Sequence, residues 1–205
     1  MTKIKLCGLS RPSDIEIVNA LMPEYIGFVF FEKSSRYITP QKANVLRRML
    51  DPEIFSVGVF VNQEPEFIAE LFHEGIINFA QLHGNEDEFY IERLRVLANI
   101  PIIQAFKIKN RDDVLKALKS EAEFILFDAG NGSGEILDWQ LLSEIKISRP
   151  YFLAGGLNPE NVIDAIKLLN PFGVDVSSGI ESTPGIKDAR KINAFVENVR
   201  RTYEA

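Results

Sequence analysis

Cysteine is almost absent from this sequence, with one residue among 205. A single thiol excludes a disulfide within the sequence and a zinc or iron–sulfur site built from several cysteines, and it is typical of a reducing compartment. Histidine is nearly as scarce, with two residues, and no group of potential ligands shows metal-binding spacing. We therefore expect no metal site.

Positive charge is not in excess either: 23 Lys and Arg against 29 Asp and Glu leave a formal net charge of −6. A nucleic acid or an anionic membrane needs a basic surface, so we expect neither as a partner. No apolar run reaches the roughly 18 residues of a membrane span. Residues 1–5 lead into a predicted strand without the apolar core of a signal peptide. We expect a cytoplasmic protein.

The sequence does contain a series of short apolar runs rich in β-branched and aromatic residues, separated by stretches of helical period. Strands alternating with helices imply right-handed crossovers and a parallel sheet. All the runs are similarly apolar, which favours a closed barrel without edge strands. We predict one domain over residues 1–205, a (β/α)₈ barrel. The eight predicted strands are Ile4–Cys7, Tyr25–Phe30, Phe55–Val61, Phe79–Leu82, Ile102–Phe106, Phe124–Asp128, Tyr151–Ala154 and Gly173–Ser177.

Two helix starts carry the expected capping residues. Thr39 precedes Pro40, and Asn158 precedes Pro159, so in each case a polar cap stands before a proline at the first helical position. We expect helices to begin at both prolines.

A thiol and a carboxyl group end two predicted strands. Alternate residues of a strand point to opposite faces, so Cys7 on the first strand and Asp128 on the sixth are predicted to point into the barrel. The C-terminal ends of barrel strands form the active face, where these two groups could move protons on one small substrate. Taken singly, Cys7 could be a buried core residue and Asp128 a turn cap; their matching positions favour catalysis.

The two groups also suit opposite roles. A thiol whose pKa is moved toward neutrality is a competent general base, and Lys5 beside it would favour the thiolate. A carboxyl group in an apolar mouth can keep its proton and act as a general acid. Lys5 itself is predicted to point inward, where an unpaired ammonium is costly. We expect Asp175, or another inward carboxylate, within hydrogen-bonding distance of it.

Small residues follow the last two strands, where barrels commonly hold phosphate. Backbone N–H groups and hydroxyls there can bind a phosphate group. The candidate phosphate-binding residues are Gly155, Gly156, Ser177, Ser178 and Gly179.

Three further polar residues and one loop remain open in role. Arg36, in the loop after the second strand, could grip a carboxylate or be a solvated charge; we expect that loop to be exposed. Gln81 and His83 end the fourth strand, and His83 is either a proton carrier or a structural imidazole without a clearly paired carboxylate. Asn131–Gly134 is either a lid or a plain connection.

These motifs together resemble phosphoribosylanthranilate isomerase of tryptophan biosynthesis, in order along nearly the whole chain. The segments that carry the resemblance are Lys5–Leu9, Gly27–Phe30 with Ser35–Tyr37, Val57–Asn62, Gln81–Gly84, Leu153–Val162, Val174–Glu181, and Pro184-Gly185 with Lys187-Asp188.

The resemblance implies a single (β/α)₈ barrel without metal or organic cofactor, acting on a small phosphoribosyl substrate as a monomer or homodimer. It implies an Amadori rearrangement of N-(5-phospho-β-D-ribosyl)anthranilate to 1-(2-carboxyphenylamino)-1-deoxy-D-ribulose 5-phosphate. In that reaction the residue matching Asp128 is the general acid, and that matching Cys7 is the general base. Arg36 would face the anthranilate carboxylate, and the glycine-rich strand ends would hold the phosphate.

Two other classes of function stay open. Another phosphosugar barrel is less favoured, because an epimerase needs metal-ligating histidines and indole-glycerol-phosphate synthase uses a lysine and a glutamate as its catalytic pair. A non-catalytic barrel that binds a phosphoribosyl ligand would not need both Cys7 and Asp128.

Overall fold

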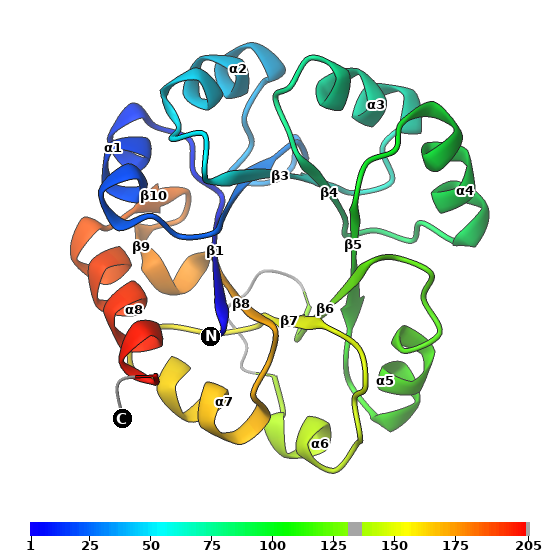
Figure 1. Ribbon diagram of the computed structural model, residues 1–205, viewed down its shortest axis with the longest axis vertical. Coiled ribbons are helices and arrows are strands. Elements are labelled where there is room, and N and C mark those ends of the chain that lie inside the picture. The colour runs from blue at the N-terminus through cyan, green and yellow to red at the C-terminus, as the bar shows by residue number, and fades with distance from the viewer. Residues whose placement is uncertain (131–136, 204–205) are drawn as a thin grey trace.

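Eight parallel strands close into a barrel in the order β1 to β8, with β8 pairing back to β1. The structure is a computed structural model and describes residues 1–130 and 137–203. The loop Asn131–Gly134, considered above as a lid, lies outside these residues. Figure 1 shows the strands as an inner ring and the helices as an outer ring. The predicted (β/α)₈ barrel is confirmed.

Each predicted strand is present, with ends that differ from the prediction by one residue at most. The observed strands are β1 (Lys3–Cys7), β2 (Tyr25–Val29), β3 (Phe55–Phe60), β4 (Phe79–Leu82), β5 (Ile102–Lys107), β6 (Phe124–Asp128), β7 (Tyr151–Leu153) and β8 (Gly173–Val176). The helices are α1 (Pro12–Leu21), α2 (Pro40–Met49), α3 (Pro65–His73), α4 (Glu88–Leu97), α5 (Arg111–Ala117), α6 (Trp139–Ser143), α7 (Val162–Leu169) and α8 (Ala189–Arg201).

A small addition after β8 was not predicted. A turn of 3₁₀ helix (Ser178–Ile180) leads into an antiparallel hairpin of β9 (Glu181–Thr183) and β10 (Ile186–Lys187). Figure 1 shows this hairpin outside the barrel, between α1 and α8. Its strands of two and three residues carry no periodic pattern that sequence reasoning could use.

The apolar residues form two layers, as the alternation along the strands requires. On β6, Ile125 and Phe127 belong to the large core between strands and helices, whereas Leu126 belongs to a separate cluster inside the barrel. The predicted inward direction of Asp128 and of its alternate neighbour Leu126 is therefore confirmed.

Aromatic rings fill the end of the barrel where the strands begin. Tyr25 meets Phe79 and Phe152 edge to face, with ring centroids 5.4 and 5.5 Å apart. Phe124 and Phe172 continue the contacts at 4.9 Å. We call this group, together with Phe55, the aromatic floor. It closes the barrel below the cavity at the opposite end.

One of the two predicted helix starts is confirmed. The Thr39 hydroxyl accepts a hydrogen bond from the Lys42 N–H, and Pro40 opens α2. The start at Pro159 is wrong, because α7 begins at Val162. Asn158 does accept from the N–H groups of Glu160 and Asn161, but it caps a turn that precedes the helix. In the described ranges, no helix is both long and apolar enough to cross a membrane.

Candidate active site

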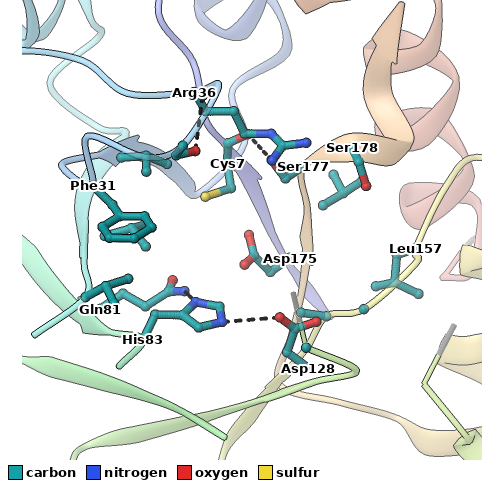
Figure 2. Close-up of a pocket in the computed structure, with 18 of the residues that line it drawn as sticks. Cys7, Phe31, Arg36, Gln81, His83, Asp128, Leu157, Asp175, Ser177 and Ser178 are labelled. Carbon is teal, nitrogen blue, oxygen red and sulfur yellow. Dashed lines mark hydrogen bonds and ion pairs between the residues drawn. The ribbon is translucent and has the colours of Figure 1, made fainter. Parts of the chain in front are cut away.

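A cavity of about 460 Å³ opens at the C-terminal ends of the strands. That volume lies in the usual range for a small-molecule site. Cys7, His83, Asp128 and Asp175 line it, and Figure 2 shows them converging on one space from β1, β4, β6 and β8. The structure thus brings together the thiol and the carboxyl group that strand parity predicted.

Cys7 ends β1 with its sulfur turned into the cavity (Figure 2), although only 6% of the residue is exposed. The neighbouring strand makes room for it. A Cβ at Gly27 would lie 2.6 Å from Cys7 Sγ, so a larger residue there would displace the sulfur. Gly27 is therefore needed for the position of the thiol.

Lys5 lies fully buried beneath Cys7 and is held by a carboxylate. Its Nζ donates to Asp175 Oδ1 at 2.9 Å, and the two residues are also partners in the β1–β8 register. The predicted Lys5–Asp175 pair is confirmed. Burial works to lower the pKa of Lys5, but Asp175 and Cys7 outweigh it and the pKa is raised, so Lys5 is an ammonium.

Asp128 has a partner that was not foreseen. His83 Nε2 lies 3.2 Å from Asp128 Oδ2, and Gln81 Nε2 lies 3.0 Å from His83 Nδ1, as the dashed lines in Figure 2 show. The expectation that His83 lacks a paired carboxylate is wrong. The sequence could not show this contact because β5 separates the two strand ends and strand parity does not fix the rotation of either side chain.

The pKa directions of the thiol and the carboxyl group are opposite to those expected. Burial raises the pKa of Cys7, and the opposing effect of Lys5 is smaller. Burial also works to raise the pKa of Asp128, but the His83 hydrogen bond and the N–H groups of Gly130 and Ala129 outweigh it, and the pKa is lowered. Without substrate the site therefore holds a thiol and a carboxylate.

Arg36 lies in the cavity wall, but it is already bound. Its Nε and Nη2 donate to the two carboxylate oxygens of Glu181 at 2.7 and 2.8 Å, and its side chain is only 16% exposed. The expectation of an exposed loop arginine is wrong. Glu181 comes from β9, so the arginine is fixed by the hairpin that the sequence did not reveal.

The same glutamate binds a second cation. Lys187, on β10, is buried and donates from Nζ to Glu181 Oε1 at 2.8 Å and to the carbonyl of Ser177 at 2.9 Å. Arg36, Glu181 and Lys187 form what we call the hairpin cluster. With two cations and one carboxylate it carries a net positive charge beside the end of β8, which suits an anionic ligand.

Most of the predicted phosphate-binding residues line the cavity. Gly155, Gly156, Ser177 and Ser178 do so from the ends of β7 and β8. Gly155 has a φ of +80°, and a Cβ there would lie 3.1 Å from Asp128 Oδ1, so both its backbone and the space beside the carboxyl group favour glycine.

Gly179 has a different place. It is not part of the cavity wall, and a Cβ on it would lie 2.0 Å from the carbonyl oxygen of Leu157. Its lack of a side chain lets the segments after β7 and β8 pass against each other. Sequence reasoning missed Glu181 and Lys187 as site residues. Both lay within the quoted motifs, but nothing in their spacing linked them to Arg36.

In the part of the chain that the structure describes, no cluster of three or more His, Cys, Asp or Glu side chains could hold a metal ion. The closed parallel barrel and the acid–base groups at its C-terminal mouth define an enzyme of the (β/α)₈-barrel class.

Comparison with known proteins narrows this class. Residues 4–198 match the family model of N-(5'-phosphoribosyl)anthranilate (PRA) isomerase. The N-(5'-phosphoribosyl)anthranilate isomerase of Endomicrobium trichonymphae is 44% identical over 205 residues, which cover 98% of this chain and 99% of that protein.

Solved structures agree. Phosphoribosyl anthranilate isomerase from Thermotoga maritima has a TM-score of 0.91 at 38% identity and covers 98% of this chain and 100% of its own. A phosphoribosyl anthranilate isomerase in complex with reduced 1-(o-carboxyphenylamino)-1-deoxyribulose 5-phosphate has a TM-score of 0.87 at 37% identity, with coverage of 98% and 100%. The chain belongs to the N-(5'-phosphoribosyl)anthranilate isomerase family and is an isomerase.

Proposed function

We propose that this enzyme converts N-(5-phospho-β-D-ribosyl)anthranilate to 1-(2-carboxyphenylamino)-1-deoxy-D-ribulose 5-phosphate in tryptophan biosynthesis, with Cys7 as general base and Asp128 as general acid. The observation that carries the assignment is the convergence of these two side chains on one cavity. The ligand of the related solved structure is a reduced form of the same product, which supports this substrate class.

In the first step, Asp128 in its acid form protonates the ring oxygen, the sugar C–O bond breaks and a Schiff base forms. The thiolate of Cys7 then takes the proton from sugar C2, and the electron pair of that C–H bond gives an enol. Transfer of a proton from the enol oxygen to C1 gives the ketone. Each residue thus exchanges one proton with the substrate.

The substrate's two anionic groups fit the two polar walls of the cavity. The phosphate would lie at Gly155, Gly156, Ser177 and Ser178, with Gly179 shaping that wall from behind. The anthranilate carboxylate would meet Arg36 through Nη1, because Nε and Nη2 serve Glu181.

The described barrel would act as a single catalytic domain, as a monomer or a homodimer; dimeric phosphoribosylanthranilate isomerase is described from Thermotoga maritima. Membership of this family favours the isomerase over the epimerase and synthase considered above.

The test is a turnover assay with ribosylanthranilate, in which the loss of substrate fluorescence measures the rate. The Cys7→Ala and Asp128→Asn enzymes are the controls. We expect turnover by the wild type and a large loss in both variants. Binding of a product analogue without turnover would instead identify a non-catalytic ligand-binding barrel.

A further inference from the structure

Three side chains at the β4 and β6 ends form a continuous hydrogen-bonded chain, Gln81–His83–Asp128. Its two links are the 3.0 Å contact from Gln81 Nε2 to His83 Nδ1 and the 3.2 Å contact from His83 Nε2 to Asp128 Oδ2. Gln81 is 1% exposed, so water does not compete for its amide. The proposed mechanism uses only the last member of this chain.

The amide nitrogen of Gln81 decides which nitrogen of His83 carries the proton. An amide NH₂ group only donates, so His83 Nδ1 must accept, and the proton of a neutral imidazole then sits on Nε2. That proton points at Asp128. The result is a histidine with its donor held toward the carboxyl group by a partner on the far side of the ring, the arrangement that orients groups in many catalytic triads.

Besides His83, the N–H groups of Ala129 and Gly130 bond the carboxyl group of Asp128. Oδ2 is hydrogen-bonded to His83. Oδ1 lies near Gly155, and because Gly155 has no Cβ the space beside Oδ1 stays open. The ring of His83, together with these N–H groups, would therefore fix the rotation of the carboxyl group so that Oδ1 faces the substrate.

We propose that His83 is a positioning residue for Asp128, that its Nε2–H holds the carboxyl group in its reactive orientation, and that Gln81 selects the required tautomer. This inference rests on the proposed role of Asp128 as the acid.

The acceptor side of Gln81 links the orientation of its amide to the tautomer of His83. Among the described residues, no donor lies within hydrogen-bonding distance of its buried Oε1. A buried acceptor without a partner costs about 1–3 kcal/mol. An amide rotated by half a turn would place that oxygen at His83 Nδ1 and the opposite tautomer would follow, so the orientation of one amide and the proton position of the histidine are coupled.

The first test reads the tautomer and needs no turnover. The chain has two histidines, His73 and His83, so long-range ¹H–¹⁵N spectra of the imidazoles contain two sets of signals, which His73→Asn assigns. At about pH 9, where an imidazole is neutral, we expect the His83 proton on Nε2. In Gln81→Met, which removes the amide with little change of size, we expect a mixture of tautomers. A proton on Nδ1 in the wild type, or an unchanged tautomer in Gln81→Met, would overturn the proposal.

The second test separates positioning from simple packing. His83→Asn should lower kcat about 10- to 100-fold with KM little changed, because an acid out of position costs roughly that much. His83→Gln places an amide N–H near the position of Nε2 and should recover much of the loss. Equal losses in the two variants would contradict positioning. His73→Asn, on the exposed end of α3, is the matched control and should leave kcat unchanged.

The pH profile gives an independent reading. His83 helps to hold the pKa of Asp128 down, so His83→Asn should move the acid limb of the kcat profile toward neutral pH and His83→Gln should move it back. Among the described residues, the other charged groups near Asp128 include Lys107, its register partner on β5, and Asp175 on β8 across the cavity, and they are unchanged in all variants. An acid limb that does not move would count against the proposal.

A double-mutant cycle completes the test. In the Asp128→Asn background, His83→Asn should add little further loss, because its effect is transmitted through Asp128. Additive losses would mean that His83 acts on its own. A wild-type enzyme that does not turn over ribosylanthranilate would refute the proposed function, while the tautomer experiment would still decide the Gln81–His83 part.

Discussion

The two ends of the barrel are made from the same eight strands but from opposite kinds of residue. Where the strands begin, the aromatic floor packs Tyr25, Phe124 and Phe152 ring against ring. Where they end, charged and polar groups face a cavity. Ordered rings stabilise a fold without taking part in chemistry, whereas buried charges cost stability unless they are paired. The difference separates what holds the barrel together from what it does.

The largest expected effect lies at the mouth. General acid or base catalysis contributes typically 10²–10⁴-fold, so Cys7→Ala and Asp128→Asn should each lower kcat by about that factor with less change in KM. Urea unfolding should change little in either variant. Near-normal kcat in Cys7→Ala would remove the thiol from the mechanism. It would also mean that this residue at the mouth is not needed for catalysis.

The floor should show the reverse pattern. Phe152→Ala removes a fully buried ring and should lower the free energy of unfolding by about 3–5 kcal/mol, while kcat per folded molecule stays near that of the wild type. Phe55, in the same cluster but 44% exposed, is the matched control, and Phe55→Ala should cost clearly less. A loss of kcat in folded Phe152→Ala enzyme would show that the two ends are coupled.

Lys5 and Asp175 lie between the two ends and should affect both stability and chemistry. Asp175→Asn leaves a buried ammonium without its carboxylate and should cost about 3–5 kcal/mol in urea unfolding. Replacing both residues, as in Lys5→Met with Asp175→Leu, should cost less than Asp175→Asn alone.

Lys5→Met should also raise the pKa of Cys7, because the ammonium opposes the effect of burial on the thiol. The rate of Cys7 alkylation as a function of pH measures this directly. An unchanged alkylation profile would show that Lys5 serves packing alone.

Arg36 should show a smaller, mixed effect. Arg36→Met should raise KM roughly 10- to 100-fold through loss of a charged hydrogen bond, and it should also lower stability because Glu181 loses its bidentate partner. Arg36→Lys keeps the charge but not the paired geometry. Its KM and its stability should lie between those of the wild type and those of Arg36→Met. If a substrate analogue without the carboxylate lost as much affinity as the native substrate, Arg36 would not bind that group.

The smallest effect concerns acid stability. Burial works to raise the pKa of Glu181, but Arg36 and Lys187 outweigh it and the pKa is lowered from 4.5. A lowered carboxyl pKa stabilises the fold above its unfolded value, and that stability is lost as pH falls through the folded value. The difference in unfolding free energy between wild type and Glu181→Gln should therefore be full at neutral pH and shrink below about pH 4.5.

Strand periodicity and parity were sufficient to predict the barrel, the inward direction of Cys7 and Asp128, and the Lys5–Asp175 pair. These features follow from a strict two-residue alternation, and the pair also from closure of β8 on β1. Contacts made beyond the strand ends were missed. The Arg36–Glu181 pair joins residues 145 positions apart through a hairpin, and His83 reaches Asp128 across β5. Turns and side-chain rotation set such contacts, and periodicity does not encode them.

A buried thiol whose pKa is raised also resists oxidation. Peroxides attack thiolates, so the buried Cys7, whose pKa is raised, should form sulfenic acid slowly. The thiol–carboxylate form holds as many protons as the thiolate–acid form that the proposed mechanism uses. Under that mechanism, moving one proton from Cys7 to Asp128 would activate the enzyme without exchange with the buffer, and the reactive thiolate would need to exist only while substrate covers it.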